Sequence, residues 1–381
     1  MTTTPSSPGP AEPVASTPSA GSGGATAYRC RSCGATITYA AGTTDLVCPS
    51  CGSKAHISAP AGQIQEHSYS SWLATSPRPV AEIEKQHFEC QSCGATTESS
   101  QIARACPFCS GALVATSTPR GLIPPESVVP FRMDKSAATT SFGTWIKSRW
   151  FAPKALKKLT VLQGGLQGVY TPHFTYDANT FTAYDGRRGV DRTETYTTTD
   201  AQGNSQTQTR TVTDWYPASG NVERFFNDVL IPGTTKVVPD KLAKAGPWAL
   251  ESSVPYQPEY LVGYSALRYD VDPPQALGEA KAGMAKVIEE DCRADIGGDH
   301  QRVTSMDTRY ADLMFKLLLL PIWIAAYSYR ARTYQVIVNA QTGEVLGDRP
   351  YSMVKIALAI ISGLILVAAI ITLIAIHNHH G

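Results

Sequence analysis

YRCRSCGAT (residues 28–36) and FECQSCGAT (residues 88–96) open two similar segments of this chain, and each segment closes on a Cys-Pro-x-Cys pair. The segments form an internal repeat. A Cys-x-x-Cys pair supplies two soft donors from one tight turn, and a second pair completes a tetrahedral site. The pattern predicts two four-cysteine zinc ribbons, over residues 28–58 and 87–116. The expected ligands are Cys30, Cys33, Cys48 and Cys51 in the first ribbon, and Cys90, Cys93, Cys106 and Cys109 in the second.

The spacing within each ribbon also bears on the role of the metal. The inner cysteines are separated by 14 and 12 residues, which fits a short β-hairpin between two knuckles. Gly34, Gly52 and Gly94 follow cysteines, where a positive φ aims backbone amides at sulfur. All four donors of each site are used, so we expect two structural zinc ions and no open position for catalysis. Iron in a rubredoxin-like site, or an iron-sulfur cluster, is the competing occupant.

The charge composition of the chain bears on whether its partner is a nucleic acid or a protein. The chain has 381 residues, with 33 Lys and Arg against 32 Asp and Glu, for a formal net charge of +1. This charge balance provides no overall basic excess that would attract the phosphates of a nucleic acid. Basic residues around the ribbons are offset by acidic ones, and no basic face with interleaved aromatics is present. We therefore expect the ribbons to contact protein, with nucleic acid as the alternative.

The segments around the ribbons are polar. Residues 1–27 are rich in Thr, Ser, Pro, Gly and Ala, without the basic start and apolar run of a secretory signal. They read as a disordered tail. Residues 59–86 read as a linker that contains Trp72 and is either a short helix or packed against the body.

A globular α+β domain is expected over residues 120–352. Asp134 precedes an apolar pattern typical of a helix, and residues 273–294 repeat that pattern. Residues 169–238 are dense in Thr, Tyr, Val and Phe, which predicts antiparallel strands with a turn at Asp185-Gly186 and a long exposed hairpin over 193–213. A hairpin is also expected around Gly343.

Two apolar stretches need separate interpretation. Residues 317–329 contain Pro321 and are short for a bilayer, so a buried strand is favoured over a re-entrant membrane segment. Residues 356–376 contain no charged residue, and roughly 21 helical residues span about 31 Å, close to the hydrocarbon core. This stretch predicts a single transmembrane helix in the membrane bilayer.

The flanks of that helix predict its orientation. The basic residues Arg330, Arg332, Arg349 and Lys355 precede it. The ionisable side chains that follow it are those of His377, His379 and His380, which stop the span or bind metal. Cytoplasmic flanks carry an excess of Lys and Arg. We therefore expect a single-pass protein of the cell membrane with its N-terminal bulk in the cytoplasm. The reducing cytosol also suits unpaired zinc-ligating thiols.

Other polar features have structural explanations. The stretch DIGGDHQR, residues 295–302, could hold a cation or phosphate, but two glycines after a helix favour a C-cap with solvated charges. Cys292 is most simply a small buried side chain. His173 lies among aromatics without a nearby nucleophile. The chain has no phosphate-binding loop and no nucleophile elbow, so we expect it not to be an enzyme.

The chain resembles a family of bacterial proteins that join twin zinc ribbons to a globular domain and a C-terminal transmembrane helix. The resemblance covers about residues 30–355. It is carried by CGAT and CPFC at the knuckles, VPF at 129–131, FAP at 151–153, GVY at 168–170, DIGGD at 295–299, LLPIW at 319–323 and GDRP at 347–350. Members are often labelled as transcription-factor-IIB-type zinc ribbons or as primosomal helicase-related. His173 and Ser110 depart from the family's usual aromatic and glycine, and neither departure removes a ligand.

The resemblance implies association with flotillin-like (SPFH) and phage-shock-type membrane-stress proteins. The chain has no nucleotide-binding loop, so we do not expect the helicase activity that the family label suggests. We expect a membrane-anchored zinc-ribbon adaptor that docks protein partners. The alternative is a membrane-tethered nucleic-acid-binding protein.

Overall fold

Three long antiparallel strands organise the chain. The computed structural model describes residues 29–58, 62–75, 86–90, 96–99, 113–116, 123–150, 165–199, 203, 205–237, 239–329, 332–347 and 352–379. The central strand β9 (Gln167–Thr199) pairs with β10 (Ser205–Pro232) on one edge and with β13 (His300–Tyr329) on the other. The expected α+β chain with a large antiparallel sheet is confirmed. The predicted tail, residues 1–27, lies outside the described residues.

Short strands extend this sheet on both sides. β8 and β4 pair with β13, β14 pairs with β13 and with β15, and β12 lies parallel to β9. A separate three-stranded sheet, β1-β2-β3, belongs to the N-terminal segment. The bounds of the short strands are Thr38–Tyr39 (β1), Asp45–Val47 (β2), Lys54–His56 (β3), His67–Ser68 (β4), Gln86–Cys90 (β5), Thr96–Ser99 (β6), Leu113–Thr116 (β7), Ser127–Val128 (β8), Val254–Pro255 (β11), Ser265–Leu267 (β12), Arg332–Asn339 (β14) and Val345–Gly347 (β15).

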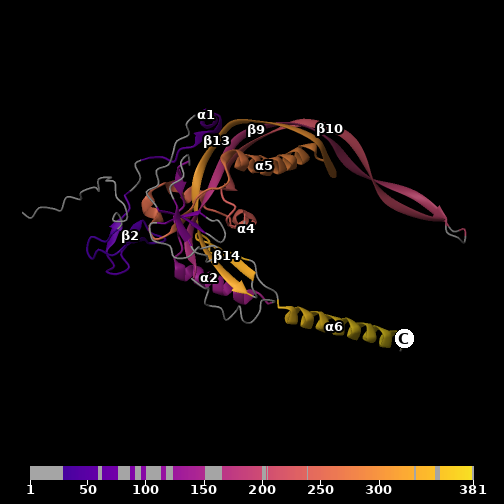
Figure 1. Ribbon diagram of the computed structural model, residues 1–381. Helices are drawn as coiled ribbons and strands as arrows, with labels where there is room; N and C mark the ends of the chain where they lie inside the picture. The colour runs from indigo at the N-terminus through magenta and orange to yellow at the C-terminus, as the bar shows by residue number, and fades with distance from the viewer. Residues whose placement is uncertain are drawn as a thin grey trace, which may run out of the picture.

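The long sheet arches over a single helix, α5 (Pro273–Ile296) (Figure 1). The register shifts between Phe226 and Val229 in β10 and between Ala311 and Met314 in β13. Both shifts lie beside the same part of β9, around Asp177. A β-bulge bends its strand and increases its twist, so two bulges at one level account for the arch.

Helix α5 begins and ends where its sequence predicts. The side chain of Asp272 accepts a hydrogen bond from the amide of Gln275 at 3.0 Å, and Pro273 occupies the first turn. Gly297 ends the helix at φ 62°. One apolar face packs on the concave side of the sheet, with Ala276, Leu277, Ala280, Met284, Ile288, Cys292 and Ile296 buried. The predicted helix and the small buried Cys292 are confirmed.

One expected turn is wrong. Asp185 and Gly186 lie inside β9 rather than at a strand end. A Cβ on Gly186 would come 2.5 Å from the carbonyl oxygen of Arg302 and 2.7 Å from Ile296 Cδ1. The glycine is therefore explained by the close approach of β13 and α5, which the local sequence does not contain.

The second half of β13 is a buried strand, as the sequence predicts. Residues 317–324 are buried, and this part of β13 pairs with β14. Helix α2 (Lys135–Ser148) begins at Asp134, whose side chain accepts a hydrogen bond from the amide of Ala137 at 2.8 Å. The hairpin between β14 and β15 turns at Gly343, with φ 77°. Shorter helical segments among the described residues are α1 (Tyr69–Ala74), α4 (Pro239–Lys244), η1 (Leu250–Ser252) and η2 (Pro258–Leu261).

The C-terminal helix α6 (Met353–His379) extends away from the body (Figure 1). Its window Lys355–Thr372 is long and apolar enough to cross a membrane, and none of that window is buried against the protein. A core helix of a soluble protein would bury such a window. The helix therefore agrees in position and composition with the predicted span over 356–376.

Candidate metal centre

The first cysteine segment forms two matching knuckles. The amide of Gly34 donates to the carbonyl oxygen of Cys30 at 2.8 Å, and the amide of Gly52 donates to that of Cys48 at 2.9 Å. Gly34 and Gly52 have φ of 74° and 75°. These are positive values that glycine adopts without steric cost, so the predicted positive φ at both glycines is confirmed. Gly94 lies outside the described residues.

The four sulfur atoms of this segment converge. Cys30 Sγ lies 3.5 Å from Cys51 Sγ, and Cys33 Sγ lies 3.5 Å from Cys48 Sγ. All four lie within 4.8 Å of one another. A tetrahedron of sulfurs at zinc-ligand distance has edges of about 3.8 Å. The sulfurs therefore surround a space suited to one metal ion, and none of the four is in a disulfide.

The electrostatics of the thiols also favour a cation between them. Backbone amides of Cys33 and Ser32 lower the pKa of Cys30 to about 6. The pKa of Cys33 rises to about 12: the amide of Ala35 lowers it, but contacts with the thiols of Cys48 and Cys51 outweigh that effect. Four thiols this close resist joint ionisation, and a divalent cation would remove the resistance. With four protein donors, such a centre would have no open position.

The segment with the four-cysteine cluster packs against the globular core. Tyr39 is 3% exposed, and its amide donates to the carbonyl oxygen of Val262 at 2.9 Å. Its ring lies 5.2 Å from that of Tyr260 in an edge-on contact. Leu46 and Ile57 belong to the same buried cluster. The outer knuckle cysteines, Cys33 and Cys51, remain exposed.

Of the second cysteine set, the structure describes only the backbone of Cys90. Cys93, Cys106 and Cys109 lie outside the described residues, and Cys90 ends β5. The backbones of β5, β6 and β7 form antiparallel pairs, and β6 also pairs with β12. The described strands thus flank the cysteine pairs, with β5 and β6 on either side of the first pair and β7 after the second, while the second metal site stays a prediction.

A cluster of ionisable side chains lies beside the two bulges of the sheet, around Asp177. No sequence pattern predicted it. Lys316, in β13, donates to Glu66 at 2.6 Å and to Asp228 at 2.7 Å. Asp177 accepts from the amide of Asp228 at 2.6 Å. The carboxylate oxygens of Glu66, Asp177 and Asp228 lie within 4.8 Å of one another. The Lys316 ammonium thus provides the cation that this acidic group requires.

The environment shifts the pKa of each of three members. Burial raises the pKa of the Asp177 carboxyl to about 6, against the opposing amide of Asp228 and with a contribution from the Glu66 carboxyl. Burial also raises the pKa of Glu66, but the hydrogen bond from Lys316 outweighs it, and the net shift is downward. For Lys316, burial lowers the pKa, but the hydrogen bonds that its ammonium donates to Asp228 and Glu66 outweigh burial, and the pKa rises.

We expect replacement of Asp177 by asparagine to change the pH dependence of stability. The pKa of an aspartate in the unfolded chain is about 3.9, and folding raises that of Asp177 to about 6. The protonated carboxyl therefore contributes most to stability below a pH of about 3.9, and this contribution is lost as the pH rises through about 6. Asparagine cannot ionise and keeps an oxygen for the Asp228 amide. Denaturant unfolding followed between pH 4 and 7 should show Asp177→Asn gaining stability relative to wild type as pH rises. Parallel curves would contradict the assignment.

The turn at residues 295–302 is a C-cap, as expected, but its charged side chains are not merely solvated. Asp295 accepts from the Tyr184 hydroxyl at 2.6 Å. Asp299 accepts from the amide of Asp191 at 2.8 Å, and His300 Nε2 lies 3.1 Å from Asp191 Oδ2. These contacts fasten the end of α5 to β9, which gives the turn a structural role.

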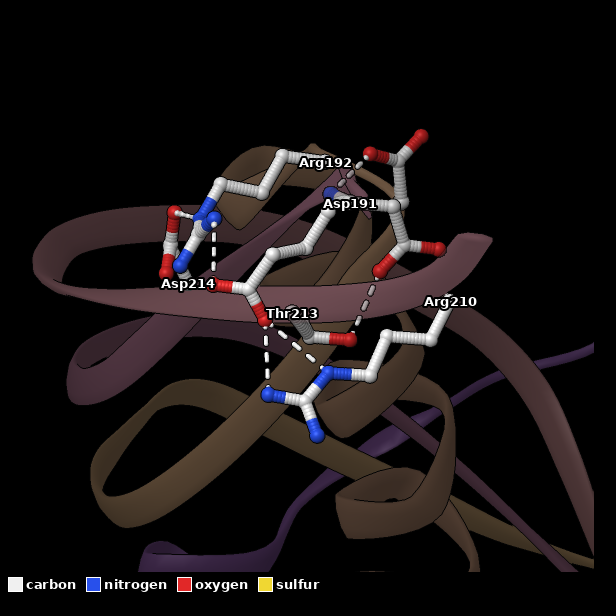
Figure 2. Close-up of polar contacts among 7 residues, drawn as sticks. Asp191, Arg192, Arg210, Thr213 and Asp214 are labelled. Carbon is white, nitrogen blue, oxygen red and sulfur yellow. Dashed lines mark hydrogen bonds and ion pairs between the residues drawn. The ribbon is translucent and has the colours of Figure 1, made fainter. Parts of the chain in front are cut away.

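The polar contacts continue along the hairpin beyond this turn. Figure 2 shows the Thr213 hydroxyl directed at Asp191 and the Arg192 guanidinium directed at Asp214. Arg210 donates to Glu194 through two nitrogens, at 2.9 and 2.7 Å. The predicted long exposed hairpin is confirmed, with a network of ion pairs along one face.

His173 is a buried neutral residue. It is 1% exposed, and its Nδ1 lies 3.1 Å from the carbonyl oxygen of Thr171. Burial lowers the pKa of His173 to about 4. Among the described residues its Nε2 has no hydrogen-bond partner. The buried ring lies beside that of Trp248, with the ring centroids 6.5 Å apart.

Comparison with known proteins finds a relative that is similar along most of the chain. Over 335 residues the chain is 25% identical to the uncharacterized protein YdjG of Bacillus subtilis (strain 168), an alignment that covers 87% of this chain and 92% of the relative. No family model and no solved structure matches the chain. The similarity extends along most of both proteins, and the relative's name states no activity.

Proposed function

We propose that this chain is a membrane-anchored cytoplasmic adaptor, whose two zinc ribbons dock protein partners at the membrane and which has no enzymatic activity. The observation that carries the proposal is a four-cysteine centre with every donor used, on a body that ends in an unburied apolar helix. Such a centre stabilises a surface rather than performing chemistry. The apolar helix supplies a single attachment to a bilayer.

Zinc is the proposed metal in both ribbons. Four thiolates in a closed tetrahedron are typical of structural zinc sites, and zinc brings no redox chemistry that would oxidise the thiols. In the first ribbon Cys30, Cys33, Cys48 and Cys51 would hold the ion. Cys90, Cys93, Cys106 and Cys109 would hold the second ion, on the strength of the repeated sequence alone.

The charge of the first ribbon supports protein over nucleic acid as the partner. The cations Arg29, Arg31 and Lys54 are exposed near its knuckles. Asp45 pairs with His56 at 3.0 Å. A zinc ion with four thiolates carries a formal charge of about −2, which offsets most of this basic charge. The exposed knuckle end is then close to neutral and unsuited to a phosphate backbone.

The orientation follows from the basic residues before the helix. Lys355 begins the apolar window, while histidines are the only ionisable side chains after it. The positive-inside rule then leaves the ribbons and the globular domain in the cytoplasm. Flotillin-like (SPFH) and phage-shock-type proteins are the proposed partners, on the resemblance described above.

Crosslinking and affinity purification of the full-length protein from membranes tests the proposal. The test variant combines Cys33→Ser with Cys51→Ser, which removes two exposed sulfurs; the matched control is Cys292→Ala, a cysteine outside the cluster. Specific membrane proteins should co-purify with wild type and the control and be lost with the test variant. Recovery of nucleic acid alone, or identical protein recovery with all three, would overturn the adaptor role.

A further inference from the structure

The hairpin of β9 and β10 continues past the rest of the sheet as a two-stranded arm. The last pair between β9 and β13 is Gly189 with His300. Beyond it, residues 190–199 of β9 pair only with residues 205–214 of β10 among the described strands. At about 3.3 Å per residue the arm is roughly 30 Å long. Figure 1 shows it extending beyond β13 and α5.

The outer edge of β10 is open along this arm. Among the described strands β10 pairs with β9 alone. Natural proteins protect open edges with lysine, proline, bulges or short strands. The stretch SQTQTRTVTDWY, residues 205–216, contains no lysine, proline or glycine and keeps a regular register, and Pro217 is the first interruption. An isolated two-stranded hairpin is only marginally stable in water, so a further strand on this edge would stabilise the arm.

The two faces of the arm differ in a way that identifies the strand it accepts. One face holds threonine pairs, such as Thr193 opposite Thr211 and Thr195 opposite Thr209. Apart from Asp191 at the base of the arm, the charges lie on the other face: Arg210 lies opposite Glu194, and Asp214 accepts a hydrogen bond from Arg192. The open edge of the charged face therefore presents one cation, Arg210, and one anion, Asp214, four residues apart.

We propose that the edge pairs with β10 of a second copy of this chain, antiparallel, about a two-fold axis at Val212. A two-fold axis perpendicular to a sheet places one residue directly opposite its own copy. With Val212 at the axis, Arg210 lies opposite Asp214 of the second copy, and the reverse pair forms by symmetry. Thr211 then lies opposite Thr213 of the second copy.

Neighbouring registers lack this complementarity. Centring on Arg210 or on Asp214 places like charges opposite each other, which is destabilising. Centring on Thr211 or Thr213 places both charges opposite uncharged residues. The Val212 register alone among these places unlike charges opposite each other. Arg210, which lies opposite Glu194 in its own hairpin, then lies opposite Asp214 of the second copy, and that Asp214 accepts a hydrogen bond from Arg192 of its own hairpin. Charge complementarity along one uninterrupted edge thus selects a copy of the same strand.

Disulfide trapping tests the register in full-length protein in membranes. Directly opposite residues have Cα atoms about 4.5–5.5 Å apart, within disulfide reach. Val212→Cys should therefore give a covalent dimer under mild oxidation. Val190→Cys is the matched control: Val190 is on the same arm and 37% exposed, but lies more than about 14 Å from its copy across three strand spacings. Equal dimer yields from both variants, or none from Val212→Cys, would overturn the register.

A charge substitution tests the interface without cysteine chemistry. In Val212→Asp the new carboxylate lies opposite Arg192 of its own hairpin, which stabilises the folded arm. At the two-fold axis it lies opposite the same carboxylate of the second copy, and the like charges repel. The matched control Thr198→Asp adds the same charge to β9, away from the β10 edge. Sedimentation in detergent should show dimerisation weakened about fivefold or more by Val212→Asp and little changed by Thr198→Asp. If both variants dimerise as strongly as wild type, the copies are in contact elsewhere, for example through α6, and the proposal is rejected.

Discussion

Replacing Lys316 with methionine is expected to lower the free energy of unfolding by about 3–5 kcal/mol. Lys316 is 8% exposed and donates to Glu66 and Asp228, while Asp177 lies beside both carboxylates. Methionine preserves the volume of the side chain but leaves the carboxylates without their cation. The cost therefore comes from buried uncompensated charge rather than from a cavity.

The measurement is denaturant unfolding of the full-length protein at neutral pH. Lys286→Met is the matched control, because Lys286 is exposed on α5 and the same substitution there removes no buried partner. The deficit of Lys316→Met should shrink in acid, where the carboxyl groups take up protons and need no cation. Equal stability of the two variants would show that Lys316 is not required to compensate the cluster.

Replacing Cys48 with serine is expected to abolish metal binding at the first ribbon and to unfold that ribbon locally. Cys48 is 1% exposed, and its backbone and sulfur take part in one of the two knuckles. Loss of one ligand should weaken metal binding by more than about a hundredfold, since changes outside the ligand shell already cost up to that amount. The binding free energy of a structural metal is largely folding free energy, so the ribbon should open with it.

Hydrogen exchange over residues 29–58, together with bound metal per chain, measures this effect. The Cys48→Ser variant should lose protection at Tyr39 and Leu46, which pack into the body's core. Cys292→Ala, which removes a buried sulfur from α5, should keep both the metal and the protection of the ribbon. Retained metal at the first site in Cys48→Ser would mean that the four sulfurs are not the ligand set.

Local sequence signals were sufficient for the knuckles of the first cysteine set and for helices α2 and α5. Cys-x-x-Cys spacing and the glycines at positions 34 and 52 carry the knuckle geometry within a few residues. Asp134 and Asp272 cap α2 and α5 by contacts to the third residue along the chain. Such features depend on neighbours in sequence, so the sequence alone can predict them.

Features set by distant residues were not predictable. Lys316 interrupts an apolar run, which signals a need for partners, but Glu66 lies 250 residues away in sequence. Gly186 resembles a turn residue until β13 and α5 are brought against it. The bulges that bend the sheet likewise depend on pairing between β9 and strands that are far away in the chain. Tertiary contacts decided each of these positions.

Native mass spectrometry of the full-length protein released from membranes tests the central claim most directly. The account predicts two zinc ions bound to each chain, because both cysteine quartets are proposed as closed zinc ribbons of a membrane-anchored adaptor. Iron, or a chain that carries no metal when purified without chelators, would contradict it.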